Sequence, residues 1–160
     1  MGTEMRIKRA ETDDELSEVR SLFREYKTTL AVDLGFQGFH NELQCLPGKY
    51  VPPDGELLIG LIEDRILGCV AVRRLDACTC EMKRLYVRPQ GRGVGLGRAL
   101  AENIIESARG LGYSRMRLDT LARLTAAMKL YESLGFHRIP PYYDNPLQGV
   151  IYWELALGKT

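Results

Sequence analysis

The sequence predicts an α/β protein of the α+β type, with a mixed, mostly antiparallel central sheet of about seven strands flanked by four helices. Three strand-like runs follow one another with only short turns between them, so they are expected to pair antiparallel. A helix-like stretch separates the third run from the next strand, which predicts one parallel pair. No linker, internal repeat or low-complexity segment interrupts the chain, so residues 1–160 are expected to form a single domain.

The first third of the chain predicts one strand and two helices. Met5 to Arg9 alternates apolar and basic residues, as a short strand does. Thr12 and Glu15 form a capping-box pattern that starts a helix. The apolar stripe of this helix is Leu16, Val19, Phe23, Tyr26 and Leu30. The stripe of a second, shorter helix is Phe36, Phe39, Leu43 and Leu46, and the proline-rich residues 47–55 form a loop.

The rest of the chain predicts three consecutive strands and then alternating helices and strands. The expected strands are Leu57 to Glu63, Ile66 to Arg74 and Cys78 to Val87, with turns at Asp64-Arg65 and Asp76-Ala77. A helix from Arg98 to Leu111 ends at Gly112, and a helix with its stripe from Leu124 to Leu134 ends at Gly135. The remaining strands are Arg115 to Asp119, Phe136 to Ile139 and Val150 to Leu155.

The composition bounds the class of protein. Lysine and arginine number 22 against 21 aspartate and glutamate residues, which argues against a nucleic-acid binder that relies on bulk charge. No stretch reaches the length of an apolar membrane span, and residues 1–10 do not form a signal peptide. The four cysteines are expected to be reduced thiols in a cytoplasmic protein, with no metal site. Whether the chain forms a homodimer stays open.

One glycine-rich turn, Gln90 to Gly97, carries most of what the sequence indicates about function. It holds four glycines between a strand-like and a helix-like stretch. Glycines adopt positive φ and let a ligand approach the bare backbone closely. The free N–H groups of the helix start, together with its positive dipole end, then point at one place. The turn is therefore expected to bind an anion, in particular a phosphate group.

Two common phosphate motifs do not fit this turn. A P-loop needs a Lys-Ser or Lys-Thr pair after its last glycine, and none follows here. A dinucleotide fingerprint needs Gly-x-Gly-x-x-Gly/Ala, but the three frames available end on Leu96, Arg98 and Leu100. The antiparallel strands before the turn are also unlike a βαβ nucleotide-binding unit.

A third template fits. Gln90-x-x-Gly93-x-Gly95, with a strand before it and a helix after it, resembles the coenzyme A pyrophosphate loop of the GNAT superfamily of N-acetyltransferases. Downstream, the segment Leu130 to Phe136, which reads Leu-Tyr-Glu-Ser-Leu-Gly-Phe, resembles the second signature of that superfamily. The predicted order of elements also matches, so the resemblance covers nearly the whole chain.

The resemblance implies acetyl-CoA, or coenzyme A, as the cofactor. The backbone of Leu85, Tyr86 and Val87 would bond the pantetheine arm. The N–H groups of the loop would hold the pyrophosphate, from Arg92 through Gly93, Val94, Gly95, Leu96 and Gly97 to Arg98. The side chains of Arg92 and Arg98 either add charge near the phosphates or remain solvated beside a site made by the backbone.

Two residues are candidates for acid–base work in acetyl transfer to an amine. Tyr131 lies on the inward stripe of its helix, and the resemblance places it near the coenzyme A sulfur as the acid; otherwise it is a core tyrosine. Glu81 lies in a central strand, where a carboxylate is costly to bury unless it is paired or functional. The resemblance implies a base there, which a chain of waters could replace; otherwise Glu81 forms a salt bridge with Lys83, Arg73 or Arg74.

The acceptor amine is not identified by the sequence, and a small molecule or a peptide both fit. The resemblance implies one wall of its cleft at Phe36 and Phe39, which could instead be core residues, and another at Tyr142 and Tyr143. Leu124 departs from the family pattern, because many members carry a cofactor-contacting asparagine there. That departure leaves open a non-catalytic module that binds or senses acyl-CoA. An accidental resemblance in a plain phosphate-binding protein is the third alternative.

Overall fold

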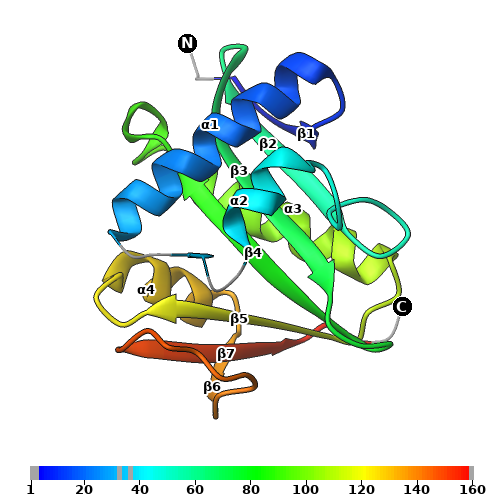
Figure 1. Cartoon of the computed structure of the whole chain (residues 1–160), viewed down its shortest axis with the longest axis vertical. Helices are drawn as coiled ribbons and strands as arrows, with labels where there is room; N and C mark the ends of the chain where they lie inside the picture. The colour runs from blue at the N-terminus through cyan, green and yellow to red at the C-terminus, as the bar shows by residue number, and fades with distance from the viewer. Residues whose placement is uncertain (1–3, 32–33, 36–37, 159–160) are drawn as a thin grey trace.

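The computed structural model describes residues 4–31, 34–35 and 38–158. Seven strands form one sheet in the order β1-β2-β3-β4-β5-β7-β6 (Figure 1). The strands are β1 (Met5–Arg9), β2 (Glu56–Ile62), β3 (Arg65–Arg74), β4 (Thr79–Val87), β5 (Arg115–Leu121), β6 (His137–Ile139) and β7 (Val150–Ala156). The helices are α1 (Asp13–Leu30), α2 (Phe39–Gln44), α3 (Leu96–Gly110) and α4 (Thr125–Ser133). Among the strands of the described residues, only β4 and β5 pair in parallel, so the predicted mixed, mostly antiparallel sheet with four helices is confirmed.

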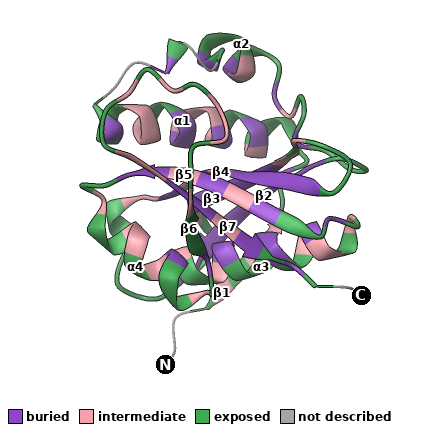
Figure 2. Ribbon diagram, turned by 90° about the horizontal axis from the view of Figure 1, so that it is seen from below, coloured by how far each residue is buried: buried purple, intermediate pink, exposed green. Residues whose placement is uncertain are grey.

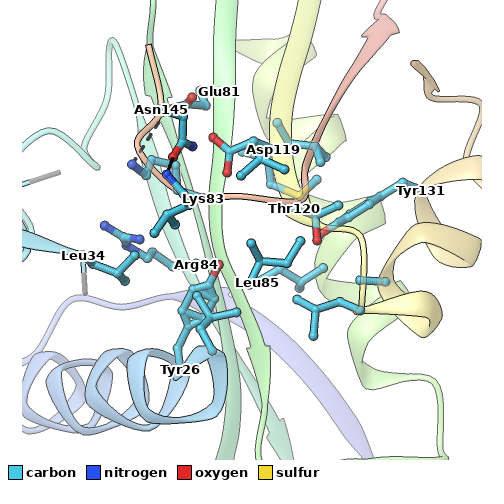
Figure 3. A pocket seen from close by; sticks show the side chains of 18 residues that line it. Tyr26, Leu34, Glu81, Lys83, Arg84, Leu85, Asp119, Thr120, Tyr131 and Asn145 are labelled. Atoms are coloured by element: carbon cyan, nitrogen blue, oxygen red, sulfur yellow. Dashed lines mark hydrogen bonds and ion pairs between the residues drawn. The ribbon is translucent and has the colours of Figure 1, made fainter. Parts of the chain in front are cut away.

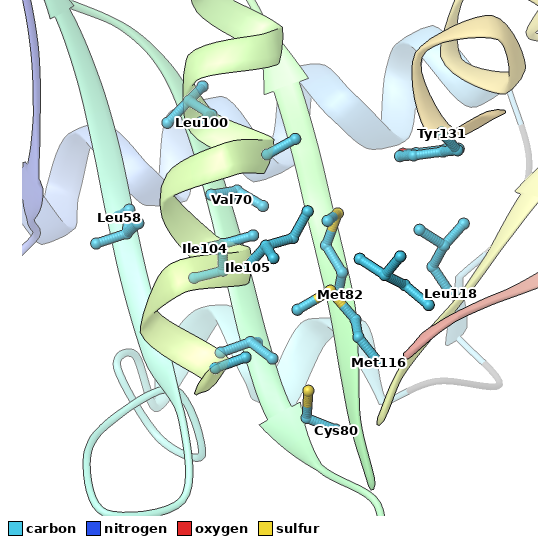
Figure 4. Packing of buried hydrophobic residues seen from close by; sticks show 14 of the residues in the cluster. Leu58, Val70, Cys80, Met82, Leu100, Ile104, Ile105, Met116, Leu118 and Tyr131 are labelled. Carbon is cyan, nitrogen blue, oxygen red and sulfur yellow. The ribbon is translucent and has the colours of Figure 1, made fainter. Parts of the chain in front are cut away.

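The helices cover both faces of the sheet. Figure 2 shows α1 and α2 on one side and α3 and α4 on the other, with the most buried positions between them. On the α3 side, Val70, Met82 and Met116 pack beneath Leu100 and Ile104 (Figure 4). On the α1 side, Val19 and Phe23 pack with sheet residues such as Ile59, Cys69 and Ala71. Each strand of the centre therefore buries both of its faces.

Two glycines let α3 lie close to the sheet. Gly60 of β2 and Gly68 of β3 are direct cross-strand partners under the start of the helix. A Cβ atom on Gly60 would lie 2.7 Å from Leu96 Cδ1, and one on Gly68 would lie 2.8 Å from Leu100 Cδ1. The first turns of α3 therefore sit directly on β2 and β3, which fixes the place at which the glycine-rich turn meets the helix.

Some boundaries differ from the predictions. The β2–β3 turn is made by Glu63 and Asp64, both with positive φ, so Arg65 already belongs to β3. Two consecutive residues with positive φ form the turn that matches the twist of a hairpin. The helix α3 begins at Leu96 rather than Arg98, and α2 ends at Gln44 before Leu46. Within the described residues, no helix is long and apolar enough to cross a membrane.

The predicted capping box of α1 is present. Thr12 Oγ1 accepts from the Glu15 N–H at 3.1 Å, and Glu15 Oε1 accepts from the Thr12 N–H at 3.0 Å. The other Glu15 oxygen lies 2.6 Å from Lys8 Nζ of β1. These hydrogen bonds, first that from Lys8 and then those from the Glu11 and Thr12 backbone, lower the pKa of Glu15 from 4.5 to about 2. The cap therefore also ties α1 to the neighbouring strand.

We expect Glu15→Gln to destabilise the protein at pH 7 and to lose this effect in acid. Because the folded pKa of Glu15 is depressed, its ionised form stabilises the fold above pH 4.5. That contribution falls as the pH drops from 4.5 towards 2. Urea unfolding at pH 7 and pH 3.5 measures the change, with Glu102→Gln on the exposed face of α3 as the control. An equal difference between Glu15→Gln and wild type at both pH values would contradict it.

Candidate active site

The central strands β4 and β5 separate partway along their length. They pair only between Thr79–Glu81 and Arg115–Arg117. Beyond this point a cleft of about 90 Å³ opens between them, with α4 and the end of α1 along its sides (Figure 3). Its lining includes Lys83 and Leu85 of β4, Asp119 of β5 and Tyr131 of α4. The separation leaves one edge of β4 without a strand neighbour, which is the setting that a bound extended group needs.

A bulge in β4 changes the direction of its side chains at this cleft. Along β3, Cys69 and Ala71 are two residues apart, but their partners Tyr86 and Lys83 are three apart. The additional residue falls next to Arg84, which has φ 62° and is 3% exposed. A bulge of this kind re-aims side chains and ends regular pairing. Because of the bulge, the side chains of the consecutive residues Lys83 and Arg84 both lie on the face of the sheet that α1 and α2 cover.

Arg84 is held in a buried ion pair with Glu42 of α2. Arg84 Nε lies 2.9 Å from Glu42 Oε2, and Arg84 Nη2 lies 3.2 Å from Glu42 Oε1. The Tyr50 hydroxyl donates to Glu42 Oε1 at 2.7 Å. The guanidinium also stacks within 5.2 Å of the Phe39 ring centroid and 5.8 Å of the Tyr26 ring centroid. This pair therefore anchors the short helix α2 to the bulge of β4.

Glu81 lies at the point where β4 and β5 part, and it is 3% exposed. Its Oε1 accepts from Arg73 Nε at 2.9 Å and lies 3.9 Å from Lys83 Nζ. Its Oε2 accepts from the Tyr142 hydroxyl at 2.7 Å. The ion pairs that the sequence offered as the alternative are thus present, and they hold the carboxylate in one orientation. Burial, and then the nearby Arg84, lower the pKa of Lys83 to about 8.

Tyr131 reaches from α4 towards the gap between β4 and β5 (Figure 3). Its ring packs against Phe136 and Trp153, with centroids 5.7 and 6.5 Å away, and the residue is 7% exposed. Burial raises the pKa of its hydroxyl above the ordinary value of 10. The phenol is therefore fully protonated at neutral pH and available as a hydrogen-bond donor in the cleft.

The glycine-rich turn meets the start of α3 without a side-chain cap. Gly93 and Gly95 have φ of 83° and 88°, and Gly95 is the N-cap residue of α3. Residues 92–95 are exposed, whereas the Leu96 side chain is buried, so Leu96 can offer only its backbone. The side chains of both arginines have protein partners: Arg92 Nε bonds the Val87 carbonyl at 3.0 Å, and Arg98 Nη2 bonds Ser133 Oγ at 2.5 Å.

Leu85, Tyr86 and Val87 form the end of β4 before the turn. Tyr86 and Val87 pair with Cys69 and Gly68 of β3, which leaves their other edge facing away from β3. The Tyr86 side chain points to α1, where its hydroxyl bonds Glu25 at 3.3 Å. Leu85 lines the cleft. Of these three residues, Leu85 therefore lies at the cleft, and Tyr86 and Val87 lie between it and the glycine-rich turn.

A second, larger pocket of about 490 Å³ lies beside the cleft, between α2 with its following loop and the sheet. Its lining includes Lys49 and Tyr50 of the loop, Arg73 of β3, and Tyr143 and Asp144 near the end of the chain. Glu81 and Lys83 line both this pocket and the cleft. These two side chains therefore lie between the two hollows.

Comparisons with known proteins identify the family. The model of the acetyltransferase (GNAT) family matches residues 16–136. The chain belongs to the GNAT family of acetyltransferases. An uncharacterized N-acetyltransferase of Schizosaccharomyces pombe is 45% identical over 148 residues, which cover 91% of this chain and 90% of that protein. The N-acetylaspartate synthetase of Danio rerio is 35% identical over 113 residues, which cover 69% of this chain but only 40% of that protein.

Solved structures of acetyltransferases share the fold. One from Streptococcus agalactiae superimposes with a TM-score of 0.79 at 24% identity and covers 95% of this chain and 98% of its own. A Salmonella typhimurium structure that contains acetyl-CoA has a TM-score of 0.73 at 20% identity and covers 98% and 96% of the two chains. At such identities the likeness shows the GNAT fold alone.

The candidate acceptor residues of this GNAT acetyltransferase lie in different environments. Phe39 is 4% exposed and packs in the core under Arg84, as its alternative interpretation predicted. Phe36 lies outside the described residues. Tyr143 lines the larger pocket, and its hydroxyl bonds Asp119 of β5. Tyr142 bonds Glu81 of β4, so the loop before β7 is attached to both separating strands.

Sequence reasoning missed several residues that the GNAT fold gathers here. Asp119 sits at the end of a predicted strand, and burial raises the pKa of its carboxyl. The sequence indicates Arg73 only as a possible partner of Glu81, whereas in the structure Arg73 also lines the larger pocket. The consecutive charges of Lys83 and Arg84 in a central strand break the alternation, which was the one local signal of the bulge.

Proposed function

We propose that this GNAT acetyltransferase transfers an acetyl group from acetyl-CoA to a primary amine by direct attack in a ternary complex. The observation that carries the proposal is that Glu81 and Lys83 line both the cleft and the larger pocket. An acceptor in the larger pocket would therefore lie beside the same two side chains that line the cleft. That arrangement supports direct attack, because the two reactants are held next to each other. The N-acetyltransferase relatives support an amine as the acceptor.

The cofactor would lie along the strand and the turn before α3. The N–H groups of residues 93–98 would bind its pyrophosphate at the positive end of the helix, whereas the Arg92 N–H already donates to the Pro89 carbonyl at 3.3 Å. The main chain of Leu85 to Val87 would bond the pantetheine arm along the edge of β4 that β5 leaves open. The thioester would then lie in the cleft near Tyr131.

In the chemical step, the amine nitrogen attacks the thioester carbonyl carbon and the C–S bond breaks. Backbone N–H groups of β4 near Leu85 would stabilise the developing oxyanion. The Tyr131 hydroxyl would donate to the leaving sulfur as its negative charge develops. Glu81 would accept the proton that the amine loses, directly or through a water. Arg73 and Tyr142 support this role by fixing the orientation of the Glu81 carboxylate.

A non-catalytic acyl-CoA-binding module is the competing function, and Leu124 supports it. Leu124 lines the cleft at the N-cap of α4, and the helix has no side-chain cap. By the family resemblance, many members carry an asparagine at this position, and that asparagine contacts the cofactor. The protonated Tyr131 hydroxyl in the cleft and the larger pocket beside the cleft support the enzyme instead.

The proposal is tested with wild type and two matched glycine variants, Gly95→Val and Gly112→Val. Both glycines have positive φ and open space around them, and they lie at opposite ends of α3. Each variant pays a similar strain of about 1–3 kcal/mol. We expect thiol release from acetyl-CoA with an amine panel for wild type, and at least about ten-fold weaker acetyl-CoA binding for Gly95→Val alone.

The outcomes separate the alternatives. Acetyl-CoA binding without thiol release for any amine would support the non-catalytic module. Stabilisation by ATP but not by coenzyme A would contradict the cofactor assignment. Equal loss of acetyl-CoA binding in Gly95→Val and Gly112→Val would show that the turn has no special part in binding.

A further inference from the structure

We infer that the acceptor is a free amino acid, or a small molecule that likewise carries a carboxylate beside its primary amine. The inference rests on the proposed function and specifies its acceptor. It comes from the distribution of charge in the larger pocket, where the acceptor would bind.

Two of the carboxylates that line this pocket, in its interior, already have cationic and hydroxyl partners. Glu42 is bound by Arg84 through two hydrogen bonds and by the Tyr50 hydroxyl through a third. Glu81 is bound by Arg73 and Tyr142. The remaining acidic residue of the lining, Asp144, is exposed at the rim. Each interior carboxylate of the pocket therefore already has a cationic partner, Arg84 for Glu42 and Arg73 for Glu81.

Three cationic residues line the same pocket as these three acidic ones. Lys49, Arg73 and Lys83 all line the pocket, in addition to the Arg84 that neutralises Glu42. Burial, and then repulsion from the nearby Arg84, lower the pKa of Lys83 to about 8; Glu81 acts against this shift, and Arg73 adds a smaller repulsion. A group with negative charge in the pocket would relieve this repulsion. The pocket is thus suited to an acceptor that brings an anion.

Arg73 is the residue that would bind that anion. It uses Nε to bond Glu81, and its side chain is 29% exposed. Within the described residues, its two terminal nitrogens make no hydrogen bond or ion pair. A guanidinium carries five N–H donors in a planar fork that fits a carboxylate. The donors beyond Nε are therefore left for a ligand in the pocket.

Arg73 and Glu81 together match the two charged groups of an amino acid. They offer a cation and an anion side by side, 2.9 Å apart, with Glu81 at the opening to the cleft. A carboxylate on Arg73 would place the adjacent amine at Glu81, next to the thioester. A polyamine would bring no anionic group for the remaining donors of Arg73. A peptide N-terminus lacks the carboxylate beside its amine.

The first test compares matched acceptors by thiol release from acetyl-CoA. Each of the twenty common L-amino acids is paired with its C-terminal amide, which keeps the amine and removes the carboxylate. We expect the best amino acid to exceed its amide in kcat/KM by about ten-fold or more, the effect of losing one charged hydrogen-bonded pair. Amides or simple amines that equal or exceed every amino acid would overturn the inference and leave the proposed function intact. Absence of turnover with every acceptor would count against the proposed function itself.

The second test uses Arg73→Gln, with Arg74→Gln as the matched control. Arg74 is the next residue of β3, but it is half exposed and lies 3.8 Å from Asp54, away from the pocket. In Arg73→Gln the preference for the amino acid over its amide should fall to about two-fold or less, and KM for the amino acid should rise about 10- to 100-fold. Arg73→Lys should keep part of the preference, because it keeps the charge.

The ratio of kcat/KM for the amino acid to kcat/KM for its amide distinguishes binding of the acceptor by Arg73 from an indirect effect. If Arg73 only oriented Glu81, its loss would lower kcat for acid and amide alike and leave their ratio unchanged. That result would overturn the inference. Circular dichroism and the Kd for acetyl-CoA check that Arg73→Gln is folded, and Arg74→Gln should match wild type in the ratio.

Discussion

Replacing Tyr131 by phenylalanine is expected to lower kcat for acetyl transfer by about 100- to 10,000-fold, the range that one acid–base group contributes. The Kd for acetyl-CoA should stay within about two-fold of wild type. The ring of Tyr131 packs against Phe136 and Trp153, and phenylalanine keeps those contacts. Only the hydroxyl, which burial holds in its protonated form, is removed from the cleft. The loss should therefore fall on the chemical step.

A second buried tyrosine serves as the control. Tyr113 is 6% exposed, and its hydroxyl bonds the Asp54 carbonyl far from the cleft. Tyr113→Phe should leave kcat within about two-fold while removing a hydrogen bond worth about 1 kcal/mol of stability. Thiol release under saturating acetyl-CoA gives kcat, and calorimetry gives the Kd. Equal kcat for Tyr131→Phe and wild type would remove this tyrosine from the mechanism.

Replacing Glu42 by alanine is expected to destabilise the protein by about 3–5 kcal/mol, because it leaves the Arg84 guanidinium buried without its counter-charge. The Arg84 side chain is 2% exposed, so water cannot take the place of the carboxylate without opening the structure. Tyr50 also loses its hydrogen-bond acceptor. At about 2–4 °C per kcal/mol for a domain of this size, Tm should fall by about 10 °C.

Two further variants check the origin of this effect. The double variant Glu42→Leu with Arg84→Met removes both charges and should recover most of the stability, because a buried pair can be replaced by apolar residues at little cost. Glu106→Ala breaks an exposed pair with Arg109 and should change stability by less than about 0.5 kcal/mol. Urea unfolding measures all of these. A loss below about 1 kcal/mol for Glu42→Ala would show that Arg84 is solvated or otherwise satisfied.

The sequence predicted those features that depend on neighbours along the chain. The capping box of Thr12 and Glu15, the C-terminal glycine of α3 and the inward stripe that carries Tyr131 each follow from residues within one or two turns. The glycine-rich turn is equally local, because strand, glycines and helix start are contiguous. These features were enough to indicate the fold class and the GNAT family.

The features that the sequence did not predict join distant segments. Glu42 and Arg84 are 42 residues apart, and neither shows by itself that it belongs to a buried pair. The meeting of Arg73, Glu81 and the loop before β7 depends on the register of β3 with β4 and on the separation of β4 from β5. The β4 bulge shifts that register by one residue, and periodicity alone does not set where a bulge falls.

If the cleft and the larger pocket bind the two substrates as proposed, two tyrosine–carboxylate contacts would link these sites energetically. Tyr142 bonds Glu81 on β4, and its neighbour Tyr143 bonds Asp119 on β5, so one short segment bridges the separation between the strands. A ligand that changes the distance between β4 and β5 must strain or break one of these contacts. The free energy of binding in the cleft then depends on occupancy of the larger pocket, and by thermodynamic linkage the reverse holds to the same extent. The two substrates would accordingly bind with a coupling energy between them rather than independently.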